Sequence, residues 1–375
     1  MYFVEKTKTL SPYKTFDYSL FVAVLLLSAI GLLALKSASV GRPGLFNTQV
    51  LAFLMGLALC LILTAIDYKD LKFLSLFFYI GIMGLMVLVL FIGKGDELGN
   101  KNWINIAGIS VQPSEFAKIA YIILAAVFLE RIKDNAENKK ANIIKFLFYS
   151  GIVIGLVLLQ KDKGTALVFC FIFILFIFSV GIPYRYLFIM GGLATLSLPF
   201  IWVYVLNDNN RERILTFLSP ERDPLGSGYN VIRSKIAIGS GQLWGQGLGN
   251  GIQTQAGNVP VNESDFIFSV IGEELGFVGG MIVIMLAMFI LLKCIHVART
   301  SSDSYGSFIA IGVTGMYAFH FIENIGMSIG LLPVTGIPLP FVSQGGTALM
   351  TCFMALGLVM SISLRRKKGI FNSSQ

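Results

Sequence analysis

Charged residues are scarce in this sequence. Only 13% of its 375 residues are Asp, Glu, Lys or Arg, whereas 55% are hydrophobic, and the mean hydropathy is +0.76. A soluble domain of this length needs far more polar surface around one core. The composition therefore excludes a soluble globule and indicates that much apolar surface faces lipid.

Cysteine and histidine are also rare. The four cysteines, Cys60, Cys170, Cys294 and Cys352, fall within or at the end of apolar runs and lack metal-ligand spacing. The two histidines, His296 and His320, have no second ligand at helical spacing. We predict no disulfide and no metal centre, and we interpret both histidines as structural.

Apolar runs of membrane-crossing length occur along almost the whole chain. A helix needs roughly 20 apolar residues to cross the hydrocarbon core. The runs predict an all-α, polytopic membrane protein of about ten transmembrane helices, at 17–38, 49–66, 71–93, 115–131, 146–160, 165–182, 186–206, 266–294, 307–332 and 347–364. Residues 1–375 are predicted to form a single membrane domain, with a long outer loop at 207–265 between the seventh and eighth helices.

Lys and Arg gather on one side of this topology. They include Lys69, Arg131, Lys293, Arg299 and Arg365. Because short basic loops stay in the cytoplasm, we expect both termini there and any active site on the outer face of the membrane. The net charge of +8 is then an orientation signal and an attraction to anionic lipid, which excludes nucleic acid as a partner.

The loop at 207–265 is too long for a simple connection, so it is functional or disordered. Tyr229, Ile232 and Ile236 share one helical face, which predicts an interfacial helix, although a surface turn is the alternative. The glycine-rich run 239–251 predicts either a surface rich in backbone donors or simple tight turns.

Charges inside or beside the predicted spans are costly and mark candidate sites. Glu115 and Lys118 follow Ser114 at a helix start, where they form a local ion pair or place the lysine against a phosphate. Glu273 and Glu274 lie deeper, so at least one should meet a cation or hydrogen-bond donor from another helix. We interpret these two as structural.

Asp265 closes the long loop at the expected boundary between water and lipid. It follows Ser264 and opens the eighth span, so it either caps a helix or serves as a general base for a lipid-linked substrate. Burial would raise the pKa of its carboxyl, and the helix start and nearby cations would lower it.

Several long motifs then carry a resemblance to a known family. They are Trp103 with VQPSEFAK at 111–118, DKGTAL at 162–167, SPERDPLGSGYNVIRSKIAIGSG at 219–241, DFIF at 265–268 with EELG, and ENIGMSIGLLPVTGIPLPFVSQGG at 323–346. In this order they resemble the SEDS family (shape, elongation, division, sporulation). The AIGSG segment is more similar to the RodA branch of that family than to the FtsW branch.

This resemblance implies a peptidoglycan glycosyltransferase that polymerises lipid II during cell elongation, with Asp265 as its catalytic residue. It also implies a class B penicillin-binding protein and the elongation machinery as partners. The substrate-binding candidates are Lys118, Arg213, Glu115, Trp103, Arg233 and Lys235, and the supporting candidates are Ser264, Glu273, Glu274, Asp162 and Ser343. A divalent cation bridging the pyrophosphate is compatible with this chemistry, although the sequence contains no dedicated metal motif.

The chain departs from the family pattern at three places. The usual QPDLGT is QKDKGT at 160–165, PExHTD is PVNESD at 260–265, and SYGGSS is SQGGTA at 343–348. Asp265 itself is retained. A lipid II flippase or transporter, an FtsW-like division role and a non-catalytic scaffold remain alternative functions.

Overall fold

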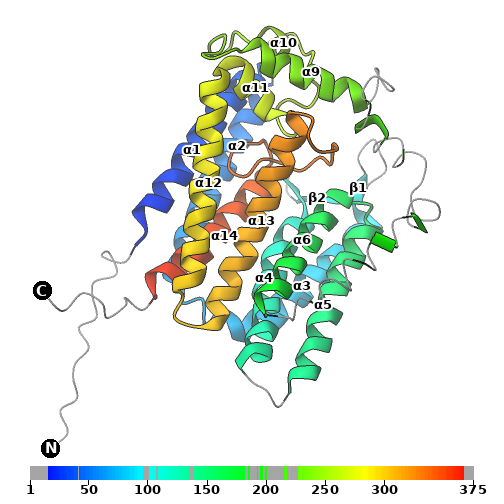
Figure 1. Ribbon diagram of the computed structural model, residues 1–375, viewed down its shortest axis with the longest axis vertical. Helices are drawn as coiled ribbons and strands as arrows, with labels where there is room; N and C mark the ends of the chain where they lie inside the picture. Colours follow the sequence, from blue (N-terminus) through cyan, green and yellow to red (C-terminus); the bar gives the residue numbers. More distant parts are fainter. Residues whose placement is uncertain are drawn as a thin grey trace, which may run out of the picture.

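The computed structural model describes residues 16–40, 42–95, 101–106, 109–134, 138–181 and 227–366, with a few isolated positions between 185 and 219. Long helices dominate it and run roughly side by side (Figure 1). They are α1 (Tyr18–Ala38), α2 (Pro43–Ala65), α3 (Leu71–Ile92), α4 (Pro113–Asp134), α5 (Lys139–Leu159), α6 (Lys163–Ser179), α12 (Gly276–Thr300), α13 (Ser304–Ser328) and α14 (Gly346–Leu364).

Most of these helices correspond to the membrane spans predicted from the sequence. Within the described residues, α1, α2, α3, α5, α12, α13 and α14 are long and apolar enough to cross a membrane. Helix α4 matches the fourth predicted span but carries charges at both ends, and α6 matches the sixth with 17 residues. The seventh, at 186–206, falls almost entirely outside the described residues, so the total of ten stays a prediction.

The eighth predicted span was wrong as a single helix. Residues 267–300 form two helices, α11 (Ile267–Glu274) and α12, which meet at Leu275. Gly276 has a φ of +68°, which an L residue with a side chain rarely adopts, and its position leaves no room for one. A Cβ there would lie 2.7 Å from the carbonyl carbon and oxygen of Leu243.

Gly276→Ala is therefore expected to destabilise the protein, by about 1–2 kcal/mol from the left-handed backbone alone and by more from the steric clash. Gly84 on α3 is the matched control, since a Cβ there meets nothing within 4 Å. Gly84→Ala should leave the thermal unfolding midpoint in detergent unchanged or raised. Equal midpoints for the two variants would contradict this account of the helix break.

The core lies around α4, α13 and α14. Helix α4 is buried along nearly its whole length, and α13 packs against α4, α6, α12 and α14. By contrast, α2, α3, α5 and α12 keep rows of exposed Leu, Ile, Phe and Met side chains. Polar residues of α4, including Glu115 and Lys118, thus stay inside the bundle while the outer helices present apolar faces.

A small sheet, which the sequence analysis did not predict, follows α3. Its strands are β1 (Lys94–Gly95), β2 (Lys101–Ile106) and β3 (Ile109–Val111), joined in that order and antiparallel. Trp103 lies on β2 opposite Lys94 and is partly buried. The strands are too short to show a clear alternation of apolar and polar residues, so the sequence gives no indication of the sheet.

The end of the bundle that carries the sheet also carries the long loop, whose described part forms α9 (Ser227–Ser240) and α10 (Ile252–Gln255) (Figure 1). We call it the Asp265 end. The predicted helix at Tyr229–Ile236 is confirmed, but its packed face is different. Val231, Ser234 and Ala237 are buried and Ile236 is exposed, because small residues let α9 approach α11 and α13 closely.

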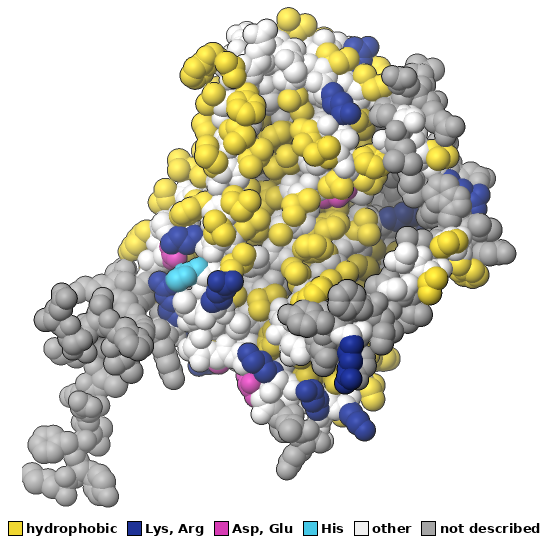
Figure 2. Space-filling view, in the orientation of Figure 1, with side chains coloured by type: hydrophobic (Ala, Val, Ile, Leu, Met, Phe, Trp, Pro, Cys, Tyr) yellow, Lys and Arg dark blue, Asp and Glu magenta, His cyan; other side chains and the backbone are white. Residues whose placement is uncertain are grey.

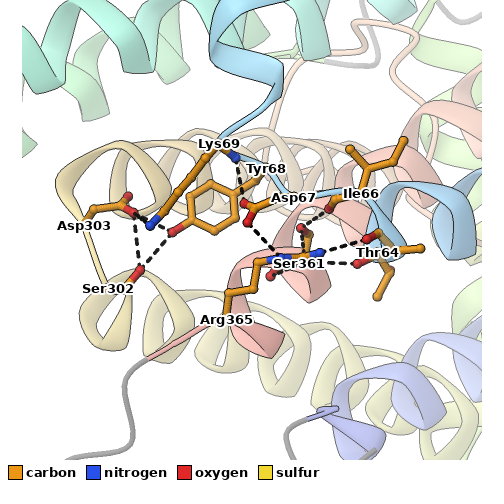
Figure 3. A network of polar contacts seen from close by, with 10 residues as sticks. Thr64, Ile66, Asp67, Tyr68, Lys69, Ser302, Asp303, Ser361 and Arg365 are labelled. Atoms are coloured by element: carbon orange, nitrogen blue, oxygen red, sulfur yellow. Dashed lines mark hydrogen bonds and ion pairs between the residues drawn. The ribbon is translucent and has the colours of Figure 1, made fainter. Parts of the chain in front are cut away.

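The opposite end, which we call the basic end, is closed by polar contacts between two turns and the end of α14 (Figure 3). Asp303 accepts hydrogen bonds from the Tyr68 hydroxyl at 2.6 Å and from the backbone N–H of Gly306 at 2.8 Å, where it caps α13. Arg365 donates to the Ala65 carbonyl at 2.8 Å and pairs with Asp67 at 3.3 Å. The α2–α3 turn is thereby tied to the start of α13 and to the end of α14.

Candidate active site

Asp265 lies in a tight turn that leads into α11. Val261 has a φ of +54°, and its carbonyl accepts hydrogen bonds from the backbone N–H groups of Ser264, Asp265 and Phe266. The N-cap of α11 is Phe266, and no side chain caps that helix. The Asp265 carboxylate is thus one residue short of the cap position, which disfavours a purely capping role.

The backbone of this turn is held at three consecutive carbonyls. The Glu263 carbonyl accepts from the backbone N–H of Gln344 at 2.9 Å, and the Ser264 carbonyl accepts from the Ser343 hydroxyl at 2.6 Å. The Asp265 carbonyl accepts from the side-chain amide of Asn324 at 2.9 Å. Helix α13 and the segment between α13 and α14 therefore fix the backbone that bears the carboxylate.

The carboxylate itself accepts few hydrogen bonds from the described residues. Among the described residues it accepts one hydrogen bond, from the Ser264 hydroxyl to Oδ1 at 3.1 Å. Its Oδ2 faces Gly336, where a Cβ would lie 3.4 Å away and where φ is +75°. A glycine at this position leaves space beside Oδ2 that a side chain would narrow.

Burial raises the pKa of the Asp265 carboxyl above its ordinary value. The Ser264 hydrogen bond opposes this rise, and the nearby carboxylate of Glu263 adds to it. Glu263 is paired with Arg42 at 2.9 Å. A carboxylate with a raised pKa is a stronger base, so this environment suits proton abstraction.

The segment 329–345 gathers the remaining parts of the site. The Thr335 hydroxyl donates to Glu323 on α13 at 2.8 Å, and the Ile337 carbonyl accepts from Asn324 at 2.8 Å. Gly164, at the start of α6, lies so close that a Cβ there would be 2.8 Å from the Thr335 carbonyl oxygen. The DKGTAL motif is thus brought beside the residues that face Asp265.

Ser343 makes two bonds that support this arrangement, donating to Ser264 and accepting from the backbone N–H of Leu339 at 2.8 Å. Ser343→Ala would leave both groups unpaired and is expected to lower turnover roughly 10-fold, equivalent to the net loss of about 1.4 kcal/mol. Ser363 is the matched control, because its buried hydroxyl has no hydrogen-bond partner among the described residues. Activity that falls equally in Ser363→Ala would sink this explanation.

Glu115 and Lys118 form a buried pair on α4. Lys118 is 1% exposed, and its ammonium donates to Glu115 Oε1 at 2.8 Å. It also lies 3.1 Å from Nε2 of His320, whose Nδ1 is 3.1 Å from the Pro338 carbonyl. Since an ammonium only donates, Nε2 accepts, and Nδ1 carries the proton given to Pro338.

This geometry favours the first role predicted for Lys118, a local ion pair with Glu115, over the second, binding of a substrate phosphate. It also reveals a residue whose contacts the sequence analysis did not predict. His320, which we interpreted as structural, links Lys118 to the segment 329–345 through these two contacts. In the sequence, the only indication of these His320 contacts was its spacing from Glu323 and Asn324, which places the three residues on one face of α13.

The other predicted residues lie in two further places. Asp162 caps α6, accepting from the Thr165 backbone N–H and hydroxyl and from Gln112 at 3.0 Å. On α9, the Arg233 guanidinium lies 5.0 Å from the Tyr229 ring, and the exposed Lys235 side chain lies over Gly330. Arg213 lies outside the described residues.

Glu273 and Glu274 are held by the glycine-rich run 239–251 and by α10, which follows it. Glu273 accepts from the backbone N–H groups of Gln253 at 2.7 Å and Thr254 at 2.9 Å. Glu274 accepts from the Gly249 N–H at 3.1 Å and from the hydroxyl of Ser37, on α1, at 2.6 Å. Of the two interpretations of this loop, the geometry favours a surface rich in backbone donors, with both glutamates as its acceptors.

The described part of the chain contains no group of three or more His, Cys, Asp or Glu residues that could hold a metal ion. All four cysteines are free thiols. A cation at the substrate pyrophosphate therefore remains a prediction that would depend on the substrate's own oxygens for ligands.

Comparison with known proteins identifies the family. The profile described as "Cell cycle protein", which groups FtsW, RodA and SpoVE, matches residues 17–368. The chain belongs to the SEDS family. Nearly the whole chain is therefore SEDS sequence, as its motifs predicted.

Individual SEDS relatives are similar over almost their full length. The probable peptidoglycan glycosyltransferase FtsW of Trichlorobacter lovleyi is 34% identical, over 93% of both chains. The peptidoglycan glycosyltransferase RodA of Treponema pallidum is 32% identical, over 94% of this chain and 98% of its own. A solved chain of a peptidoglycan synthase complex that coordinates polymerization and crosslinking is 30% identical, with a TM-score of 0.78 over 93% of this chain and 97% of its own.

Proposed function

We infer that this chain is a peptidoglycan glycosyltransferase that polymerises lipid II, with Asp265 as its general base. Its SEDS relatives carry the name of that activity. One observation carries the assignment of Asp265. Its backbone is fixed at three consecutive carbonyls, yet among the described residues its carboxylate accepts a single hydrogen bond.

We propose the following chemistry for this carboxylate. A carboxylate oxygen of Asp265 takes the proton from the 4-hydroxyl of the acceptor sugar. The hydroxyl oxygen of the acceptor attacks the anomeric carbon of the donor at the same time. The bond from that carbon to the undecaprenyl pyrophosphate breaks, and the pyrophosphate leaves with the bonding electrons. A single displacement inverts the anomeric configuration, as in inverting glycosidases.

Cations should stabilise the departing pyrophosphate. Arg233 and Lys235 on α9 are our candidates within the described residues, and Arg213 remains a candidate from the sequence. Lys118 is a weaker candidate than the sequence suggested, because Glu115 and His320 already hold its ammonium. Trp103, partly buried on β2, is proposed to contact the lipid-linked substrate at the same end.

The physiological setting is also part of the proposal. We place the Asp265 end on the outer face of the bacterial inner membrane and the basic end, where α1 begins and α14 ends, in the cytoplasm. We propose a role in elongation with a class B penicillin-binding protein, supported by the similarity to a chain from a synthase complex. Comparable identity to FtsW and RodA relatives leaves a division role as the alternative.

The decisive experiment supplies lipid II to the purified protein together with its class B penicillin-binding protein. Glycan strands in gels that resolve product length are the expected result. A second assay, in liposomes, measures whether lipid II changes leaflet. Movement of lipid II without strand synthesis would replace the glycosyltransferase with the flippase alternative.

A further inference from the structure

The stretch of the long loop between Lys235 and Glu263 contains no charged residue at all. Surfaces that face water ordinarily carry many Asp, Glu, Lys and Arg side chains. This stretch begins in the last part of α9, includes α10 and forms the tip of the Asp265 end (Figure 1). Its composition is that of a segment that avoids bulk water, although it lies beyond the ends of the spanning helices.

Large apolar side chains of this stretch point outward. Trp244 is 80% exposed, Ile252 is 68% exposed and Leu243 is 61% exposed, with Leu248 also exposed. In a water-facing loop these side chains would turn inward. A group of exposed apolar side chains of this kind marks a surface that contacts something apolar.

Three backbone N–H groups of the same loop point the other way, toward α11. The backbone N–H groups of Gln246 and Gly247 donate to the carbonyls of Glu273 and Glu274 at 3.0 Å, and Gly249 donates to the Glu274 carboxylate. These backbone donors are therefore satisfied against α11, while the large apolar side chains of the loop are exposed. Such an inverted arrangement is stable where the surroundings are lipid, because lipid cannot pair with backbone groups.

The exposed loop residues are continuous with the lipid-facing side of α12. The backbone N–H of Val278 donates to the Leu243 carbonyl at 3.2 Å, and Phe277 beside it is 60% exposed. Further along α12 the exposed apolar row continues through Ile282, Met285, Phe289 and Leu292. Figure 2 shows hydrophobic side chains from the upper end of the molecule down the face that α12 occupies.

We propose that residues 241–252 are inserted into the interfacial region of the lipid leaflet at the Asp265 end, with Trp244 and Leu243 as the anchors. Tryptophan is enriched at this depth because its ring is apolar and its N–H can reach water. The loop is bonded to Glu273 and Glu274, where α11 meets α12. Its insertion therefore sets the depth of α11, the helix that begins two residues after Asp265.

The test uses the intrinsic fluorescence of Trp244 in lipid nanodiscs without any partner protein. Trp103→Phe combined with Trp202→Phe leaves Trp244 as the only tryptophan of the chain. The lipids carry bromine, which quenches tryptophan, either near the headgroup or near the chain ends. A matched variant adds Trp244→Phe and Met288→Trp, which moves the single tryptophan to an exposed position midway along α12.

The expected result is a blue-shifted Trp244 emission that headgroup-proximal bromine quenches more than deep bromine, with the opposite preference at position 288. Red-shifted emission that dissolved iodide quenches and brominated lipid does not would overturn the proposal. Protection from both quenchers would overturn it as well, because it would mean that protein, such as a second copy, covers the loop.

Discussion

Asp265→Asn is expected to lower the rate of glycan strand synthesis roughly 10²–10⁴-fold, the contribution that a positioned general base makes. Asparagine keeps the size of the side chain and can still accept a hydrogen bond from Ser264, so the turn that bears it should be retained. The measurement is strand synthesis from lipid II by the purified complex. Full activity in this variant would remove Asp265 from the chemical step.

The same variant should not lose stability, which separates a catalytic from a structural role. Because the folded pKa of Asp265 is raised, its protonated form is favoured by folding, and that stabilising contribution is lost as the pH rises through the folded pKa. Above that folded pKa the ionised wild-type carboxylate is a cost that asparagine removes. Asp265→Asn should therefore unfold at an equal or higher temperature than wild type, and the difference should shrink on acidification.

Glu263 provides a matched control two residues away. Its carboxylate raises the pKa of Asp265, and its partner Arg42 is exposed. Glu263→Gln should keep activity and lower the pKa of Asp265, so the acid limb of the rate profile should move to lower pH. An acid limb that does not move in this variant would show that the profile reports another group.

Much of the fold could be predicted because lipid imposes a simple rule on sequence. Eight of the ten predicted spans coincide with single helices, since a run of apolar residues in lipid must satisfy its backbone within a helix. The break at Leu275 could not be predicted this way. It depends on Gly245 and Leu243, which pack against Gly276 from a distant part of the loop.

The candidate site was predictable in its central residue and not in its surroundings. Asp265 was distinguished by its position at a helix start next to a long loop. The groups that fix it, Asn324 and Ser343, come from α13 and the segment after it and reach Asp265 only in the folded chain. Similarly, no local pattern predicts that Lys118 meets His320, which lies 202 residues away in sequence.

The buried pair on α4 should have the largest effect on stability. Lys118→Met would leave Glu115 buried without its cation, and breaking a buried pair in this way costs about 3–5 kcal/mol. Replacing both partners, Glu115→Leu with Lys118→Met, should recover most of that loss because no unpaired charge remains. Unfolding midpoints of the single and double variants in detergent measure the difference.

Activity should not return with stability in the double variant, because the bond from Lys118 to His320 is also lost. That bond orients the imidazole that donates to Pro338, two residues after Gly336, which faces Asp265. A loosened segment should lower kcat, whereas loss of a direct phosphate contact would raise KM.

His320→Gln is the complementary test, since glutamine can accept from Lys118 and donate to Pro338, whereas His320→Leu can do neither. A raised KM in the double variant, with His320→Leu fully active, would show that Lys118 acts on the substrate and not through this segment.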